Sequence, residues 1–229
     1  MTVLPKRKQN RQNRERRILD AALRVFAAMG YSGATMDAVA AGAGLTKPTI
    51  YSYFPSKESL FQAMMLGKRD RMLDVFEHPS PEGMVQDLHT FAWDYADTVM
   101  RPDMLSLARL IIGEVQRFPE IGRAYQASGP DHVLRGIMRY LADRRDDGLL
   151  AFEDAELAAQ DLWGLILSAP RTQALYMPDA APDRATLARY VANGLRVFLR
   201  AYSTKPDIHL GQLEAILHAP ATQQVIHDA

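Results

Sequence analysis

No cysteine occurs among the 229 residues, which excludes disulfides, thiolate nucleophiles and zinc sites built with Cys ligands. The chain also lacks a run of about 18 apolar residues, the length that a membrane-spanning helix needs. Its basic N-terminus, MTVLPKRKQNRQNRERR, leads into no apolar signal core. The sequence therefore predicts neither secretion nor membrane spanning, and we expect a cytoplasmic protein.

The chain carries no net charge, but its charges are unevenly distributed. Up to Leu60 there are ten Lys and Arg residues against four Asp and Glu residues, and the remainder has seventeen against twenty-three. A basic N-terminal segment of this kind is attracted to polyanions. A solvated basic arm without a partner would have the same composition, so charge alone leaves both interpretations open.

Helical periodicity covers the chain, because apolar residues recur three and four positions apart and almost no segment alternates as a strand would. The sequence therefore predicts an all-α fold. The first four helices are expected at Asn10–Met29, within TMDAVAAG (35–42), within KPTIYSYF (47–54) and at Ser56–Glu77. The later helices are expected at Glu82–Met100, Pro102–Arg117, Glu120–Ala127, Asp131–Asp146, Asp154–Tyr176, Arg184–Tyr202 and within DIHLGQLEAILHA (207–219).

The two short helices, joined by a glycine-containing turn, have the pattern of a helix-turn-helix, whose second helix enters the major groove of DNA. Leu45, Ile50 and Phe54 are expected to face inward at helical spacing. The side chains left facing outward are Lys47, Pro48, Thr49, Tyr51 and Tyr53. Lysine can donate to guanine edges or phosphates, and tyrosine hydroxyls can donate to phosphates. Short helix pairs with glycine turns also occur in proteins that bind no DNA, so the spacing alone does not decide.

Polar residues next to these helices are expected to complete the motif. Thr35, Thr46 and Ser56 stand where N-caps belong. Lys57, together with the first-turn amides after Ser56, is expected to bind a phosphate.

The string TMDAVAAGAGLTKPTIYSYFPSKESLFQAM (35–64) closely resembles the N-terminal signature of the tetracycline-repressor (TetR) family, and the resemblance covers about residues 14–65. It implies an all-α homodimer that binds palindromic double-stranded DNA and is released by a small-molecule effector, with no cofactor. By this resemblance Lys47, Pro48 and Thr49 read bases. The phosphate-contacting positions it implies are Thr35, Thr46, Tyr51, Tyr53 and Lys57. Ser52 departs from the pattern, because many members have an aromatic residue there.

Beyond residue 65 the likeness is looser. LARLIIGEVQRFPEIGRAYQASGP (107–130) resembles one branch of the family, which includes regulators of efflux-pump genes. We therefore expect a basic flexible arm over residues 1–13, a DNA-binding domain over 14–60, and a ligand-binding and dimerisation domain over 61–229.

The middle helices are rich in methionine and aromatic side chains, which suit an apolar or amphipathic ligand. The candidate ligand-binding residues are Phe91, Trp93, Tyr95, Met100, Met104, Phe118 and Met138. The same residues would also suit an ordinary core.

The last two long helices offer an apolar surface interrupted by small residues, which would let two subunits form a four-helix bundle. The residues expected on it are Leu157, Gly164, Ile166, Leu167, Ala169, Leu187, Val191, Gly194, Leu195, Phe198 and Tyr202. They could instead belong to the core of one subunit.

The six histidines are scattered, and none forms the i, i+4 pair of a helical zinc site or lies in a nucleophile elbow. We therefore expect no metal site and no enzymatic activity. The prediction is a ligand-responsive DNA-binding regulator, and the alternatives are a ligand-blind DNA-binding dimer or an all-α enzyme.

Overall fold

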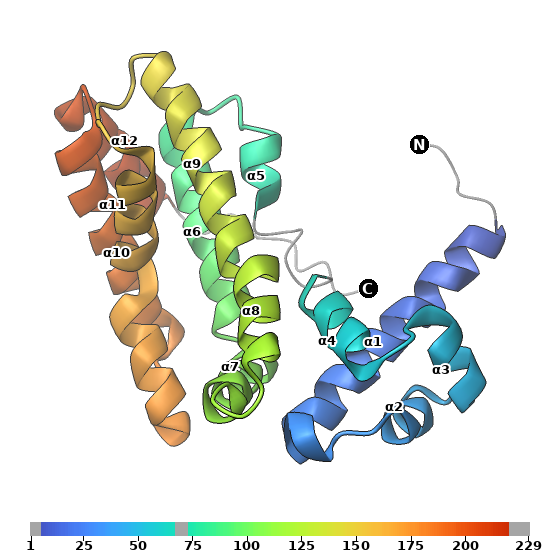
Figure 1. Ribbon diagram of the computed structural model, residues 1–229. Helices are drawn as coiled ribbons and strands as arrows, with labels where there is room; N and C mark the ends of the chain where they lie inside the picture. The colour runs from blue at the N-terminus through green and yellow to red at the C-terminus, as the bar shows by residue number, and fades with distance from the viewer. Residues whose placement is uncertain (1–5, 67–72, 220–229) are drawn as a thin grey trace. The chain divides into compact units, whose positions relative to one another are not determined.

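The computed structural model describes residues 6–66 and 73–219, and in these residues the chain is all-α, as predicted. Among the described helices, none combines enough length with enough apolarity to span a bilayer. The helices, labelled in Figure 1, are α1 (Lys6–Gly33), α2 (Met36–Ala43), α3 (Lys47–Tyr53), α4 (Lys57–Leu66), α5 (Asp74–Glu77), α6 (Met84–Val99), α7 (Pro102–Glu114), α8 (Pro119–Ser128), α9 (Pro130–Asp146), α10 (Ala155–Tyr176), α11 (Arg184–Tyr202) and α12 (Pro206–His218). Every helix predicted after residue 80 is observed, with ends that differ by only a few residues.

The chain divides into two compact units. Unit 1 joins Met1–Arg71 to Thr98–Val133, so it contains α1 to α4 together with α7 and α8. Unit 2 joins Met72–Asp97 to Leu134–Ala229, and it contains α5, most of α6 and α9, and α10 to α12. The boundary expected at residue 60 does not coincide with this division, because α7 and α8 pack with the N-terminal helices.

The core of unit 1 connects the helix-turn-helix segment to α7 and α8. Phe26 on α1, Ile50 on α3 and Leu60 on α4 are fully buried. Leu107 from α7 and Ile121 from α8 belong to the same hydrophobic cluster. The two short helices therefore rest on a core that residues beyond position 100 help to build.

Helix α1 is longer at both ends than the predicted Asn10–Met29. It begins at Lys6, so it includes most of the segment expected as a flexible arm, and residues 1–5 lie outside the described part. Gly30 kinks the helix with φ 72° and ψ 170°. A Cβ at Gly30 would lie 2.9 Å from Oε1 of Glu114, but that atom is the end of a flexible side chain, so it is the positive φ that favours glycine here.

The prediction of one helix over Ser56–Glu77 is wrong at Leu73. Helix α4 covers Lys57–Leu66, and α5 begins as a separate helix after Leu73, whose φ of −107° and ψ of 0° are not helical. Residues 67–72, with Met72, and the side chain of Met65 lie outside the described residues. Phe76 on α5 stacks on Phe91 and Tyr140 within unit 2, at centroid distances of 4.6 and 4.1 Å.

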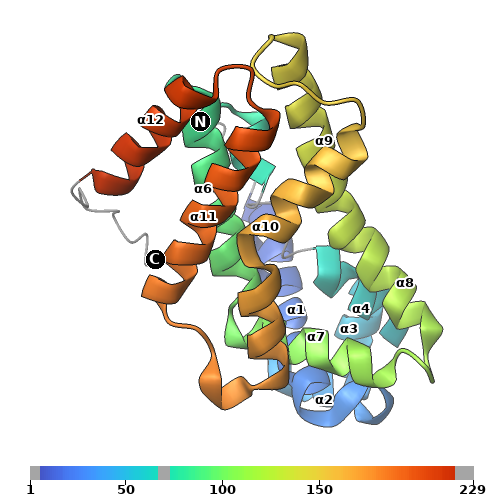
Figure 2. The same ribbon diagram turned by 90° about the vertical axis from the view of Figure 1, so that its left-hand side faces the viewer.

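In unit 2, α10 and α11 lie side by side (Figure 2). Gly194 is buried where they cross, and a Cβ there would lie 2.5 Å from the carbonyl oxygen of Leu165. The expectation that Gly194 lies on a dimer surface is therefore wrong, because it makes a contact within the subunit. The other expected surface residues that are buried within the subunit are Ile166, Leu167, Leu187, Val191, Leu195 and Phe198. Leu157, Gly164 and Ala169 are exposed, and Tyr202 is half-buried.

Candidate nucleic-acid interface

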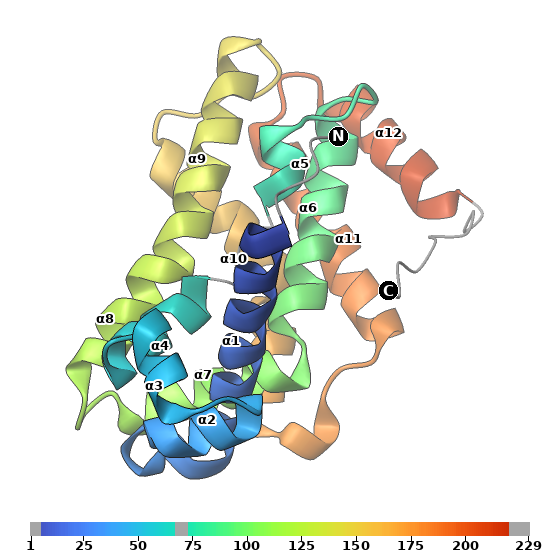
Figure 3. The ribbon, with the colours of Figure 1, turned by 90° about the vertical axis from the view of Figure 1, so that its right-hand side faces the viewer.

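Two short helices and a three-residue connection, residues 44–46, form the helix-turn-helix (Figure 3). Thr35 caps α2, because its hydroxyl oxygen accepts a hydrogen bond from the amide of Ala38 at 3.1 Å. Gly44 ends α2 in the left-handed conformation with φ 61°, and its N–H bonds back to the last turn. Thr46 occupies the N-cap position of α3, where Pro48 is tolerated because first-turn amides have no helical partner.

Helix α3 has one buried face and one exposed face. Ile50 is fully buried, Phe54 is 5% exposed, and Leu45 packs against the same core, as predicted. Of the candidate DNA-binding residues, Thr35, Thr46, Lys47, Pro48 and Tyr51 are exposed, and Thr49, Tyr53 and Lys57 are half-buried. The exposed face of α3 thus presents Lys47, Pro48 and Tyr51, with Thr49 at its edge.

Lys47, the first residue of α3, is held by Asp37 on α2. The ammonium nitrogen lies 2.9 Å from a carboxylate oxygen of Asp37, and both side chains are more than half exposed, at 55% and 63%. The hydrogen bond to Asp37 and its charge raise the pKa of Lys47. The lysine is therefore charged and oriented at neutral pH. An exposed ion pair of this kind is weak, so the ammonium of Lys47 can leave Asp37 for another anion.

The hydroxyls of α3 are linked to one another. The hydroxyl oxygens of Thr46 and Thr49 lie 2.8 Å apart, and Thr46 makes no side-chain capping bond. Ser52, where the resemblance leads us to expect an aromatic residue, donates to the carbonyl oxygen of Thr49 at 2.7 Å. Thr49 is thereby fixed on the exposed edge of the helix, next to Lys47 and Pro48.

Lys57, expected at a phosphate, makes contacts inside unit 1. Its ammonium donates to the carbonyl oxygens of Tyr31 at 2.8 Å and Ala34 at 3.3 Å, and it lies 4.5 Å from the centre of the Tyr31 ring. These carbonyls are at the end of α1, so the lysine caps that helix. Ser56 starts α4 as predicted: its hydroxyl accepts from the amide of Ser59 at 3.1 Å.

Two arginines that the sequence reasoning did not assign also hold the motif together. Arg17 donates to the carbonyl oxygen of Ala43 at 2.7 Å, and Arg24 donates to that of Gly42 at 3.3 Å. Both carbonyls are at the C-terminal end of α2, where a positive charge is favourable. The sequence feature that could have revealed Arg17 and Arg24 is their spacing of seven residues, which places both on one face of α1.

The structure divides the candidate ligand-binding residues between the two units. Met100, Met104 and Phe118 belong to unit 1, where Met104 and Phe118 pack against its core. Phe91, Trp93, Tyr95 and Met138 belong to unit 2. Phe91 and Tyr95 are buried, whereas Trp93 and Met138 are half-buried.

Unit 2 contains a row of aromatic rings and a buried carboxylate, and sequence reasoning missed the carboxylate. The rings of Phe91 and Tyr95 lie 6.0 Å apart, and Tyr95 contacts Trp163 edge-on at 5.9 Å. Asp87 is fully buried and accepts a hydrogen bond from the hydroxyl of Tyr140 at 2.6 Å. Burial, followed by the bond to Asp87, raises the pKa of Tyr140. No periodicity distinguishes Asp87 from an exposed helix residue, since its partner is distant in sequence.

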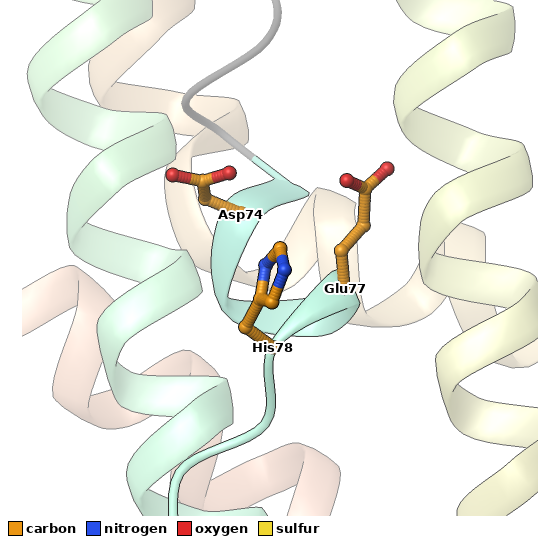
Figure 4. A group of neighbouring side chains, drawn as sticks. All are labelled: Asp74, Glu77 and His78. Atoms are coloured by element: carbon orange, nitrogen blue, oxygen red, sulfur yellow. The ribbon is translucent and has the colours of Figure 1, made fainter. Parts of the chain in front are cut away.

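One group of potential metal ligands occurs within the described residues: Asp74, Glu77 and His78, whose ligand atoms lie within 4.8 Å of one another. Figure 4 shows the three side chains projecting from α5 and the residue that follows it. All three are exposed, and exposed acidic groups are common on helical surfaces without an ion.

A helix-turn-helix whose second helix begins with an exposed lysine, followed by a larger helical region, is the arrangement found in DNA-binding regulators of transcription. Residues 18–64 match the model of the bacterial regulatory proteins of the tetR family, and residues 86–204 match that of the C-terminal domain of the AefR-like transcriptional repressor. The chain belongs to the TetR family of bacterial transcriptional regulators.

Three relatives illustrate the similarity. A TetR transcriptional regulator from Agrobacterium tumefaciens is 27% identical, with 86% of this chain and 98% of that chain covered and a TM-score of 0.67. The flavonoid-responsive regulator FrrA is 27% identical, with 85% and 99% covered and a TM-score of 0.64. The uncharacterized HTH-type transcriptional regulator YhgD of Bacillus subtilis (strain 168) is 28% identical over 137 residues, which are 60% of this chain and 70% of YhgD.

Proposed function

We propose that the chain is a repressor that binds a palindromic operator as a homodimer and is released by a small apolar or amphipathic molecule. The observation that carries the proposal is the exposed face of α3, on which Lys47, Pro48 and Thr49 stand together at the start of the helix. In this proposal these three residues contact base edges. The residues that contact phosphates are Thr35, Thr46, Tyr51, Tyr53 and Lys57.

A dimer is supported by apolar side chains left on the outer faces of α10 and α11. Leu157 on α10 is 58% exposed, and Tyr190 and Val197 on α11 are 40% and 37% exposed. Gly164 has open space around its Cβ position, so a second helix can approach closely there. Two α10–α11 pairs would then form a four-helix bundle with twofold symmetry, which matches the symmetry of a palindromic operator.

Release by a ligand is supported by the aromatic row of unit 2 and by the similarity to a flavonoid-responsive regulator. Phe91 and Tyr95 are buried, so a planar apolar molecule would displace a neighbouring ring such as Phe76 to stack on them, and Asp87 or Tyr140 would supply a polar contact. Met104 and Phe118, which pack in unit 1, would respond to the ligand indirectly. A ligand that binds more tightly to the conformation with low DNA affinity lowers operator affinity by the coupling factor, typically about 5- to 150-fold.

The release claim is tested by titrating operator DNA with the full chain in the presence of flavonoids and other planar aromatic compounds. We expect a compound that binds the protein to weaken DNA binding. Trp93→Leu, a change at a half-buried ring of unit 2, should reduce that response while leaving DNA affinity in the absence of compound unchanged. If compounds bind and operator affinity never changes, the protein is a ligand-blind DNA-binding dimer.

A further inference from the structure

The N-terminal turns of α1 carry a concentrated positive charge. Residues 6–17, which we call the basic extension, contain seven Lys and Arg residues and one acidic residue, Glu15. In the described residues the first buried side chain of α1 is Ile18, and residues 9–14 are all exposed. The basic extension is about 18 Å long at 1.5 Å per residue, and its first turns project beyond α2 and α3 (Figures 1 and 3). The side chains of residues 9–17 are therefore not needed to fill the core of unit 1.

This charge arrangement is unfavourable for an isolated helix. Arg11, Arg14 and Arg17 follow one another at a spacing of three, where like charges repel. The first turn of α1 contains no acidic residue, although the N-terminal end of a helix favours negative charge. Within the described residues, Arg11 and Arg14 form no ion pair with a carboxylate. An exposed row of like charges that costs helix stability and has no carboxylate among the described residues to neutralise Arg11 or Arg14 is typical of a surface that meets a partner of opposite charge.

The basic extension is continuous with the helix-turn-helix. The guanidinium of Arg11 lies over the ring of Tyr53 on α3, 5.7 Å from its centre. Two turns along α1, Arg17 donates to Ala43 just before the connection to α3. Arg14 lies between them on the same face of α1. The cations of the basic extension therefore begin beside the helix that we propose enters the major groove.

From this placement we infer that the basic extension is a second DNA-contacting element, in which Arg11 and Arg14 bind phosphates of the duplex that flanks the base pairs contacted by α3. The inference rests on the proposed DNA-binding role of α3 and extends the interface from the short helices to α1. Phosphate contacts carry affinity without reading bases, so the basic extension adds affinity and salt dependence and leaves sequence preference unchanged. Binding a polyanion also removes the repulsion along the helix, so DNA stabilises it.

The test uses the full chain and a random-sequence duplex of about 40 base pairs, because phosphate contacts do not depend on sequence. The variant is Arg11→Gln with Arg14→Gln. The matched control is Arg135→Gln with Arg139→Gln, which removes the same charge from exposed positions on α9 in unit 2. The measurement is the association constant as a function of salt concentration.

We expect the Arg11/Arg14 variant to reduce the slope of log K against log salt by about 2 per protomer, since each lost phosphate contact contributes about 0.9. The control should bind like the unaltered chain. Hydrogen exchange of residues 6–17 should slow when DNA is added. A slope and affinity equal to those of the control, with unchanged exchange, would overturn the inference.

The alternative binding partner of the basic extension is the acidic remainder of the chain after Leu60. If Arg11→Glu with Arg14→Glu lowers thermal stability or changes sedimentation while the salt slope stays constant, the basic extension binds protein and the inference is wrong. The random duplex measures phosphate contacts alone. A finding that α3 selects no DNA sequence would therefore contradict the proposed function without deciding whether the basic extension binds phosphates.

Discussion

Lys57 donates its ammonium to the carbonyl oxygen of Tyr31 at 2.8 Å, across 26 positions of sequence. The contact ties the start of α4 to the end of α1. Tyr31 is almost fully buried, and its ring contacts Phe26, Phe61 and Phe118, so the bond lies at the edge of the aromatic centre of unit 1. A residue expected to serve DNA therefore also serves the fold.

Lys57→Met should lower the free energy of unfolding by about 1–3 kcal/mol, because two helix-end carbonyls lose a charged donor. The measurement is equilibrium denaturation of the full chain. Lys205→Met, at an exposed lysine beside α12, is the control and should change little. A Lys57 variant as stable as the unaltered chain would show that these two hydrogen bonds do not stabilise unit 1.

Asp37→Asn should strengthen binding to DNA of any sequence. The substitution frees Lys47 from its ion pair and removes a negative charge from the face that approaches phosphates. The gain should shrink as salt is added, because both groups are exposed and screened. Titration of a random duplex at two salt concentrations measures it, and weaker binding would show that Asp37 is needed to orient Lys47.

Substitutions at Gly194 and Val197 should distinguish a residue that stabilises the subunit from a residue that lies in the dimer interface. Val197→Glu, on the outer face of α11, should give a folded monomer in sedimentation velocity. Ile208→Glu makes the same change at a more exposed site on α12 and should remain a dimer. Gly194→Ala should instead destabilise the subunit by about 1–3 kcal/mol, because its Cβ meets the backbone of α10. A dimeric Val197→Glu protein would place the interface elsewhere.

Asp94→Asn should stabilise the protein near neutral pH. Burial, followed by the charges of Asp97 and Asp74, raises the pKa of Asp94 above its ordinary value of 3.8. The folded state then binds the proton of Asp94 more tightly than the unfolded state does. Ionised Asp94 therefore lowers the free energy of unfolding, fully at pH values above the raised pKa and not at all below the ordinary pKa. The melting temperature of the variant should exceed that of the unaltered chain near pH 7 and converge with it below pH 3.8. Asp143→Asn, which removes the same charge from an exposed position on α9, is the matched control.

Features fixed by a few neighbouring residues could be predicted from sequence. Thr35 and Ser56 cap their helices as expected, because capping depends on positions two or three residues away. The inward positions of Ile50 and Phe54 follow from helical period alone. The exposed face of α3 was predicted for the same reason.

Features fixed by distant contacts could not be predicted. Small residues such as Gly194 indicate that two helices approach closely, but they do not say whether both belong to one subunit. The packing of α7 and α8 into unit 1 and the bond between Tyr140 and Asp87 each join segments far apart in sequence. Helix α1 begins earlier than expected because polar and basic residues give no apolar period to follow.

The most direct test of the account is selection of genomic DNA fragments by the unaltered chain, in parallel with Lys47→Gln and Thr49→Val. We predict that the unaltered chain enriches fragments containing an inverted repeat. Each variant should still bind DNA but should lose about tenfold discrimination at particular base pairs of that repeat. Enrichment of no sequence over random DNA, or an identical preference in all three proteins, would contradict the assignment of α3 as the reading helix.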